Sequence, residues 1–322
     1  MHCANHLGPG TVRRLKGTGV AVGLVFVVVL AGSTVLRAQE KTPDLSPSEL
    51  VRVTVANELA AANHPEVHHL FCSRRQTPKG SQTRIYVETS DAIAGMLVAA
   101  NNRPLNPAQQ KAETDRLASL INNPDQLRRK AAREKEDEDR SLRIVKALPY
   151  AFLYEYAGTE NSAPGLGRPG DTLVKLSFKP NPNYNPPTHV EQVLTGMKGE
   201  LLIDTQTCRL ARIDGTLFQD VTFGWGILGH LNQGGHFRVQ QADLGLGDGD
   251  WGITEMNLNM TGKILMFKSL SIVSDEVLTD FHRLPNKLTF AQGVEILKTE
   301  GIKLAHINHA AEATEAKREG AN

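Results

Sequence analysis

Apolar and polar residues alternate along residues 196–271, and this alternation predicts a run of short antiparallel strands. Polar or charged side chains such as Glu200, Asp220 and Arg238 stand between apolar ones. Period-two alternation places one side of a strand on a core or cavity and the other side in water. We therefore expect an antiparallel sheet with a single apolar face. The positions expected to share this face and line a cavity are Leu201, Ile203, Val221, Phe223, Phe237, Met256, Leu258 and Met266.

Glycine-containing segments divide this stretch. Thr261-Gly262 predicts a turn between two strands, and Asp-Gly-Asp at residues 248–250 predicts another hairpin turn. Three glycines also separate bulky residues at Trp225, Ile227 and Leu228. These side chains could form an exposed rim that inserts into lipid or a partner. The alternative is a bent connection whose side chains close one end of the sheet.

A capped amphipathic helix is predicted before the sheet. Ser46 and Glu49 form a capping box around Pro47, and apolar residues then recur at helical spacing as far as Ala62. Pro65 predicts the end of this helix, because the residue before a proline disfavours helical backbone. Its apolar stripe must be buried, and the sheet is the expected partner.

A helical insertion is expected at residues 106–147. Its second half mixes charges of both signs, which is typical of a solvated helix supported by i,i+4 pairs. The functional alternative is a helix that binds a partner. A C-terminal helix is expected within residues 286–304, and the polar, Ala-rich residues 305–322 predict a disordered tail. Further strands are expected at residues 67–74, 82–89, 93–99, 150–156 and 173–178.

The N-terminus has the pattern of a secretory signal peptide. Arg13, Arg14 and Lys16 precede an apolar core at residues 20–31, which is shorter than the ~20 residues needed to span a bilayer. Cleavage after Ala38 would remove residues 1–38 as the signal peptide. The mature chain has no later apolar run of spanning length, so we expect a periplasmic or secreted protein. An uncleaved N-terminal anchor is the alternative.

Charge and cysteine content narrow the function further. The chain has 322 residues and a net charge of +1, so it lacks the basic surplus of a nucleic-acid-binding protein. Cys3 lies in the predicted signal peptide, which leaves Cys72 and Cys208. In an oxidising compartment these two could be joined by a disulfide. They could equally be two separate buried thiols, because free cysteine is often buried.

The histidines and cysteines do not form a recognisable catalytic or metal-binding motif. His64 and His68 are four residues apart, but Pro65 interrupts a helix there, and His68 and His69 would point to opposite faces of a strand. A dyad of Cys72 with one of these histidines is a weaker alternative to a structural thiol. There is no G-x-S-x-G elbow. We therefore expect a non-enzyme without a cofactor or a bound metal.

A family resemblance rests on five segments, which are residues 46–62, Ala94-Gly95-Met96-Leu97, residues 101–105, residues 199–204 and Cys208-Arg209-Leu210. Their order resembles the LolA/LolB-like superfamily, which comprises periplasmic lipoprotein carriers and related lipid-binding or regulatory domains. The resemblance covers about residues 46–270 and implies a curved, incomplete barrel whose open apolar side is closed by helices. The charged helices at residues 106–146 and the Pro/Asn-rich loop at residues 179–187 depart from the compact carriers.

Together these observations predict an α+β protein with a curved antiparallel sheet, an incomplete β-barrel, and helices packed on its concave side. The main domain is expected to span residues 46–285. The first functional hypothesis is an exported non-catalytic binding protein whose cavity holds a lipid or other apolar ligand, with a lipid or lipoprotein as partner. The second is an interaction module of the cell envelope whose groove is packed and whose rim or charged helix binds an envelope protein.

Overall fold

The fold is that of a computed structural model, which describes residues 45–62, 67–223, 229–247, 249–264 and 268–301. Its helices are α1 (Pro47–Ala62), α2 (Pro107–Asn122), α3 (Pro124–Ala151), α4 (His189–Gln192), the 3-10 turn η1 (Val193–Gly196) and a C-terminal helix that begins at residue 290. Its strands are β1 (His68–Thr77), β2 (Gly80–Val87), β3 (Ala94–Ala100), β4 (Arg103–Pro104), β5 (Phe152–Asn161), β6 (Thr172–Pro180), β7 (Met197–Asp204), β8 (Arg209–Leu217), β9 (Val221–Phe223), β10 (Gly229–Leu231), β11 (His236–Asp243), β12 (Trp251–Ile264) and β13 (Lys268–Leu284).

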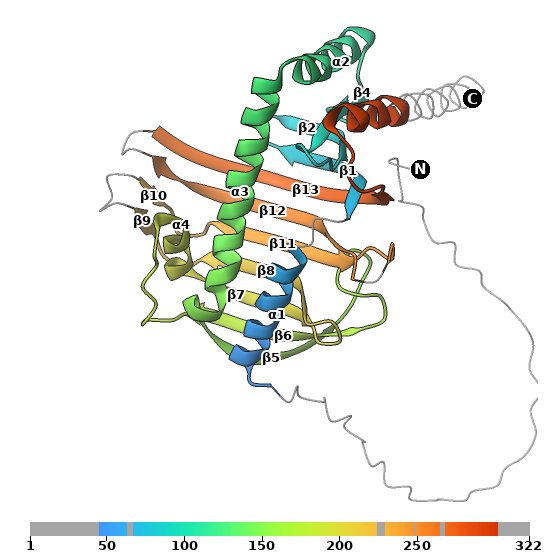
Figure 1. Ribbon diagram of the computed structural model, residues 1–322. Helices are drawn as coiled ribbons and strands as arrows, with labels where there is room; N and C mark the ends of the chain where they lie inside the picture. Colours follow the sequence, from blue (N-terminus) through green and yellow to red (C-terminus); the bar gives the residue numbers. More distant parts are fainter. Residues whose placement is uncertain (1–44, 63–66, 224–228, 248, 265–267, 302–322) are drawn as a thin grey trace, which may run out of the picture.

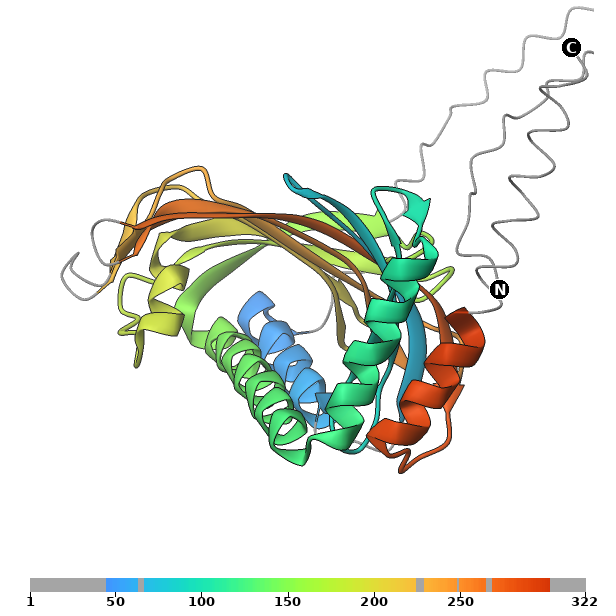
Figure 2. The same ribbon diagram turned by 90° about the horizontal axis from the view of Figure 1, so that it is seen from above.

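All of these strands belong to one 13-stranded sheet whose main path runs β4-β3-β2-β1-β13-β12-β11-β8-β7-β6-β5. The paired strands are antiparallel. The two ends of the path, β4 and β5, are the edges of an open sheet, which arches strongly rather than closing into a barrel (Figures 1 and 2). The predicted α+β class with a curved antiparallel sheet is confirmed.

The larger core lies under the arch, where α1 and α3 cover the concave face (Figure 2). The capping box predicted at the start of α1 is present, because Ser46 N donates to Glu49 Oε2 at 3.0 Å and Glu49 N donates to Ser46 Oγ at 3.4 Å. Leu50 and Val51 of α1 and Leu148 of α3 are buried against the sheet. The apolar side chains of α1 and of the alternating strands therefore pack together in one layer.

A second core lies at the other end of the sheet. Phe290, Val294 and Leu297 of the C-terminal helix are buried against Val87 and Ala94 of β2 and β3. Leu117 of α2 belongs to the same core, so α2 and the C-terminal helix enclose the blue strands at this end (Figure 2). The sheet thus links two separately covered apolar layers.

Two local predictions are wrong. The expected turn at Thr261-Gly262 lies within β12, which runs unbroken to Ile264. A Cβ added to Gly262 would lie 2.1 Å from the carbonyl oxygen of His230, so glycine permits β10 to approach β12 closely. The strand expected from residue 150 begins at Phe152, because α3 continues through Pro149 to Ala151. Among the described residues, no helix has both the length and the apolarity to cross a membrane.

Candidate functional site

The predicted cavity residues that the structure describes lie on the concave face, but they differ in exposure along the sheet. Leu201, Ile203 and Val221 are 1%, 0% and 4% exposed and belong to the core sealed by α1 and α3. These three side chains fill a packed layer and do not line an open space. At this half of the sheet the structure matches the hypothesis of a packed groove.

The concave face becomes more open toward β11 and β12. Phe237, Leu258 and Phe223 are half-buried at the margin of the larger core, and Met256 is half-buried on the same face of β12 as Leu258. Ile272, the cross-strand neighbour of the buried Met260, is 37% exposed. Large apolar side chains on the concave face at β11, β12 and β13 therefore remain accessible. We call this face of the sheet the concave floor. Met266 lies outside the described residues.

The next strands of the same face are polar. Leu258 pairs with Ser274 and Met256 pairs with Glu276, so directly opposed residues carry the concave face from β12 onto β13. Ser73 Oγ of β1 donates to Glu276 Oε1 at 2.5 Å, and Arg75 Nε donates to Ser274 Oγ at 2.7 Å. The concave floor thus changes from sealed apolar to open apolar to polar across neighbouring strands. The sequence analysis did not predict that these polar residues of β1 and β13 continue the concave face.

The rim candidates Trp225, Ile227 and Leu228 lie outside the described residues, so their role stays a prediction.

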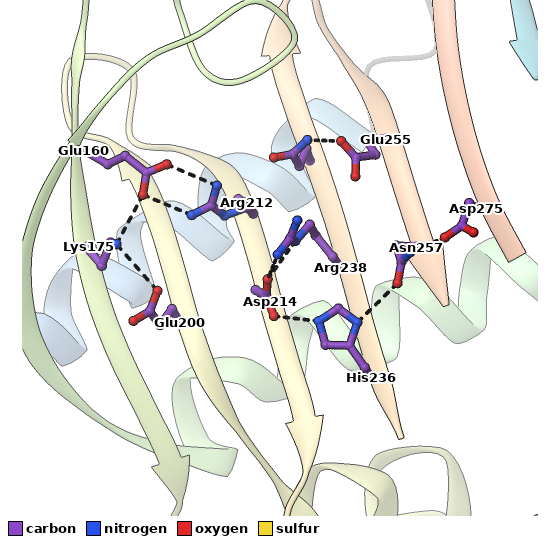
Figure 3. Close-up of polar contacts among 11 residues, drawn as sticks. Glu160, Lys175, Glu200, Arg212, Asp214, His236, Arg238, Glu255, Asn257 and Asp275 are labelled. Atoms are coloured by element: carbon purple, nitrogen blue, oxygen red, sulfur yellow. Dashed lines mark hydrogen bonds and ion pairs between the residues drawn. The ribbon is translucent and has the colours of Figure 1, made fainter. Parts of the chain in front are cut away.

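The face of the sheet away from α1 and α3 carries polar contacts that cross several strands (Figure 3). Arg212 Nη2 lies 3.0 Å from Glu160 Oε2, and Lys175 Nζ lies 3.2 Å from the same oxygen. Farther along the sheet, Arg238 Nε donates to Asp214 Oδ2 at 2.7 Å. Glu160 and Asp214 each have a cation beside them, which is the pattern expected of a stabilising cross-strand ladder.

His236 extends this ladder. Its Nε2 lies 2.9 Å from Asp214 Oδ1 and its Nδ1 lies 3.2 Å from Asn257 Oδ1 (Figure 3). Partial burial acts to raise the pKa of Asp214, but hydrogen bonds from Arg238 and His236 outweigh it and lower that pKa below its ordinary value. A carboxylate held ionised in this way is suited to structural pairing rather than to proton transfer.

A second polar cluster joins two distant parts of the sheet. The side chain of His69 is 12% exposed; its Nδ1 lies 3.1 Å from Glu88 Oε2 and its Nε2 lies 2.9 Å from Asp250 Oδ1. Acceptance of a hydrogen bond by the Glu88 carboxylate raises the pKa of His69, against the opposing effect of burial, and Asp250 raises it further. The contact ties the segment before β12 to the start of β1. We call it the His69 clamp.

The clamp does not form a metal site, because the two carboxylates bind opposite nitrogens of one ring and cannot share an ion. Within the described ranges no group of three or more His, Cys, Asp or Glu side chains is placed to hold a metal. His64 is outside these ranges, and His68 lies one residue from His69 at the start of β1, with its Nδ1 buried and without a hydrogen-bond partner.

Cys72 and Cys208 are thiols and are not joined by a disulfide. Cys72 lies in β1 and Cys208 precedes β8, and the sheet order places β13, β12 and β11 between these strands. Four strand spacings correspond to roughly 19 Å, whereas a disulfide requires Cα atoms within about 7 Å. Of the two alternatives from the sequence, the structure has separate thiols.

No protein-family model matches the sequence, and no curated protein matches it. Among solved structures, one match is a candidate outer membrane lipoprotein-sorting protein domain from Vibrio parahaemolyticus, with 10% identity, a TM-score of 0.27, and coverage of 79% of this chain and 100% of that one. Another is MucB in complex with MucA(peri), with 7% identity, a TM-score of 0.21, and coverage of 76% and 100%. Likenesses this weak decide neither fold nor function, and the LolA/LolB-like resemblance stays a prediction.

Proposed function

We propose that this protein is an exported, non-catalytic binding protein of the LolA/LolB-like type that holds a lipid or acyl chain on its concave floor. The observation that carries the proposal is the change in exposure along one face of the sheet. Leu201 and Ile203 are sealed under the helices, whereas Leu258 and Met256 stay half-exposed beside polar Ser274. An open apolar surface bordered by polar groups fits an apolar ligand that has a polar end.

The first test is native mass spectrometry of the mature protein, exported from a bacterial host, together with organic extraction of what it carries. We expect a chain that begins at Gln39 and an additional mass that extracts as lipid. A bare protein mass would contradict the carrier hypothesis. A chain that keeps residues 1–38 would contradict the predicted cleavage.

A pair of variants locates the ligand. Leu258→Lys places a charge on the proposed floor, and Val277→Lys places the same charge on the opposite face, where Val277 of β13 is 48% exposed and pairs with Glu255. We expect Leu258→Lys to reduce the amount of bound lipid at least about tenfold, because burial of a charge against an acyl chain is costly. Val277→Lys should keep it. Equal loss in both variants would place the ligand elsewhere.

The second candidate is an interaction module of the cell envelope. It is favoured by the packing of Leu201, Ile203 and Val221, which fills the concave face under α1 and α3. If this candidate is correct, the protein has a bare mass and cross-linking in intact cells captures one specific envelope protein. Recovery of only the protein itself would count against it.

A further inference from the structure

Helices α2 and α3 follow each other directly in the chain and point in different directions (Figure 1). A cleft of about 500 Å³ is lined by residues of both helices. This volume is within the range of roughly 300–1,000 Å³ that small-molecule sites occupy. The residues that line it are Arg116, Leu120, Gln126, Arg129, Lys130, Arg133, Glu134 and Asp137. Four of these side chains are cationic and two are anionic, so the cleft carries a local excess of positive charge.

The carboxylates in the cleft are already engaged. Glu134 pairs with Lys130 and also accepts a hydrogen bond from the backbone N of Ile93 at 3.0 Å. Asp137 Oδ1 lies 3.0 Å from Arg140 Nη1. The acidic side chains of the cleft are therefore held by other groups and do not neutralise its remaining cations.

Arg129 and Arg133 are the cations left over. Within the described part of the chain neither guanidinium has a hydrogen bond or an ion pair. They are four residues apart on α3, where like charges repel and destabilise an isolated helix. A ligand oxyanion between them would relieve this repulsion and accept hydrogen bonds from two planar donors, an arrangement that suits phosphate and carboxylate groups.

An adjoining cavity is mainly apolar. It measures about 250 Å³ and shares Arg116, Leu120, Lys130 and Glu134 with the cleft. Its other lining residues come from β2, β3, the residue before β3, α2 and the C-terminal helix, and are Arg84, Tyr86, Ile93, Gly95, Leu117 and Phe290. A cationic mouth therefore opens beside an apolar interior.

We propose that these two cavities together bind an anionic amphiphile, with its phosphate or carboxylate head at Arg129 and Arg133 and its apolar chain beside Leu120 and Phe290. Most of the other cations of α3 are paired with acidic side chains of the same helix. Arg128 pairs with Asp125, and Lys135 Nζ lies 3.1 Å from Asp139 Oδ1. The site adjoins the polar end of the concave floor, because Arg84 pairs with Ser73 across β2 and β1, but Leu258 and Met256 do not line it. The two proposals are therefore tested separately.

Calorimetric titration of the full-length mature protein tests the proposal with three probes used below their micelle concentrations: dodecyl phosphate, inorganic phosphate and uncharged dodecyl maltoside. We expect dodecyl phosphate to bind at least tenfold more tightly than either of the others. The double variant Arg129→Ala, Arg133→Ala should bind dodecyl phosphate at least about tenfold more weakly, because each substitution removes a charge-assisted hydrogen bond. Arg128→Ala combined with Arg143→Ala removes the same charge from α3 outside the cleft and should change the affinity less than twofold.

Three results would overturn the proposal. The first is the absence of dodecyl phosphate binding to the native chain. The second is an equal loss of affinity in both double variants, which would indicate attraction by net charge alone. The third is inorganic phosphate binding as tightly as dodecyl phosphate, which would make this a site for free anions. Leu258→Lys should leave dodecyl phosphate binding intact, which separates this site from the concave floor.

Discussion

A single histidine holds the segment before β12 to the start of β1. His69 lies between Glu88 and Asp250, its ring meets Phe281 edge-on, and Arg283 is its cross-strand neighbour on β13. The two carboxylates favour the protonated imidazole over the neutral one. Because the pKa of His69 is raised in the folded state, the clamp contributes stability that depends on pH.

The pH dependence has a defined sign. The contribution of the clamp is fully present below the ordinary histidine pKa of about 6.5, and it is lost as the pH rises through the raised pKa of the folded state. We expect His69→Gln to lower the free energy of unfolding most at pH 5.5–6.5, with the deficit shrinking at higher pH. Urea unfolding of both proteins at a series of pH values measures this. A deficit that grows with pH would contradict the assignment.

At the residue scale the sequence identified the apolar positions of the sheet but not its polar contacts. The sequence suggests His69 as a metal ligand or as a partner of Cys72, but not as a partner of Glu88 and Asp250, because these lie 19 and 181 residues away. The polar contacts of Figure 3 are likewise not predicted from the sequence, because their partners are far apart in the chain; Glu160 and Arg212 are 52 residues apart. Strand alternation places such residues on one face, but only the strand order shows which of them meet.

At the scale of elements, one carboxylate fixes α1 to the sheet. Glu58 Oε1 accepts from Arg209 Nε at 2.8 Å and from the backbone N of Leu210 at 2.8 Å. Its Oε2 also accepts from Gln241 at 3.4 Å, so the side chain reaches two strands. Both Glu58 and Arg209 are largely buried, which leaves little water to replace a lost partner.

Removal of this carboxylate tests its role. Glu58→Ala leaves the Arg209 guanidinium and the Leu210 N–H without their partner, so we expect the free energy of unfolding to fall by about 3 kcal/mol. Arg52→Ala, at an exposed position of the same helix, should change it by no more than about 0.5 kcal/mol. Denaturant unfolding followed by circular dichroism measures both. Equal effects would mean that helix propensity, rather than the Glu58 contacts, explains the loss.

The element predictions succeeded where the local signal and the tertiary demand agree. The capping box of Ser46 and Glu49 and the apolar stripe after it set the start and the buried face of α1. They failed at Gly262, where glycine serves a close contact with β10 instead of a turn. They also failed at residue 150, where a strand was expected but α3 continues through Pro149 to Ala151, because packing of Leu148 and Ala151 outweighs the cost of a proline inside a helix.

At the scale of the whole molecule, the two cores are joined by a continuous sheet. Met260 of β12 belongs to the larger core, whereas Leu70 of β1 and the C-terminal helix belong to the second. β13 pairs with both β12 and β1 and therefore connects them. A loss of packing at one end of the sheet should be felt at the other end through these strands.

Phe290→Ala tests this coupling. Phe290 is 1% exposed in the second core, so we expect a loss of about 3–5 kcal/mol in the free energy of unfolding. Circular dichroism and tryptophan fluorescence should still report one shared transition, shifted to lower denaturant concentration. Glu295→Ala, on the exposed side of the same helix, is the control. Two separate transitions would show that the second core unfolds independently of the larger one.

The open edges of the sheet have a consequence for the behaviour of the protein at high concentration. One edge, β4, is two residues long and contains Pro104, which has no N–H to donate. The other edge, β5, has an irregular register between Tyr156 and Gly158, and Gly158 adopts a positive φ of 105°. Edges that are short or kinked are poor templates for a strand from another molecule. We therefore expect β4 and β5 to resist edge-to-edge aggregation even though the sheet never closes into a barrel.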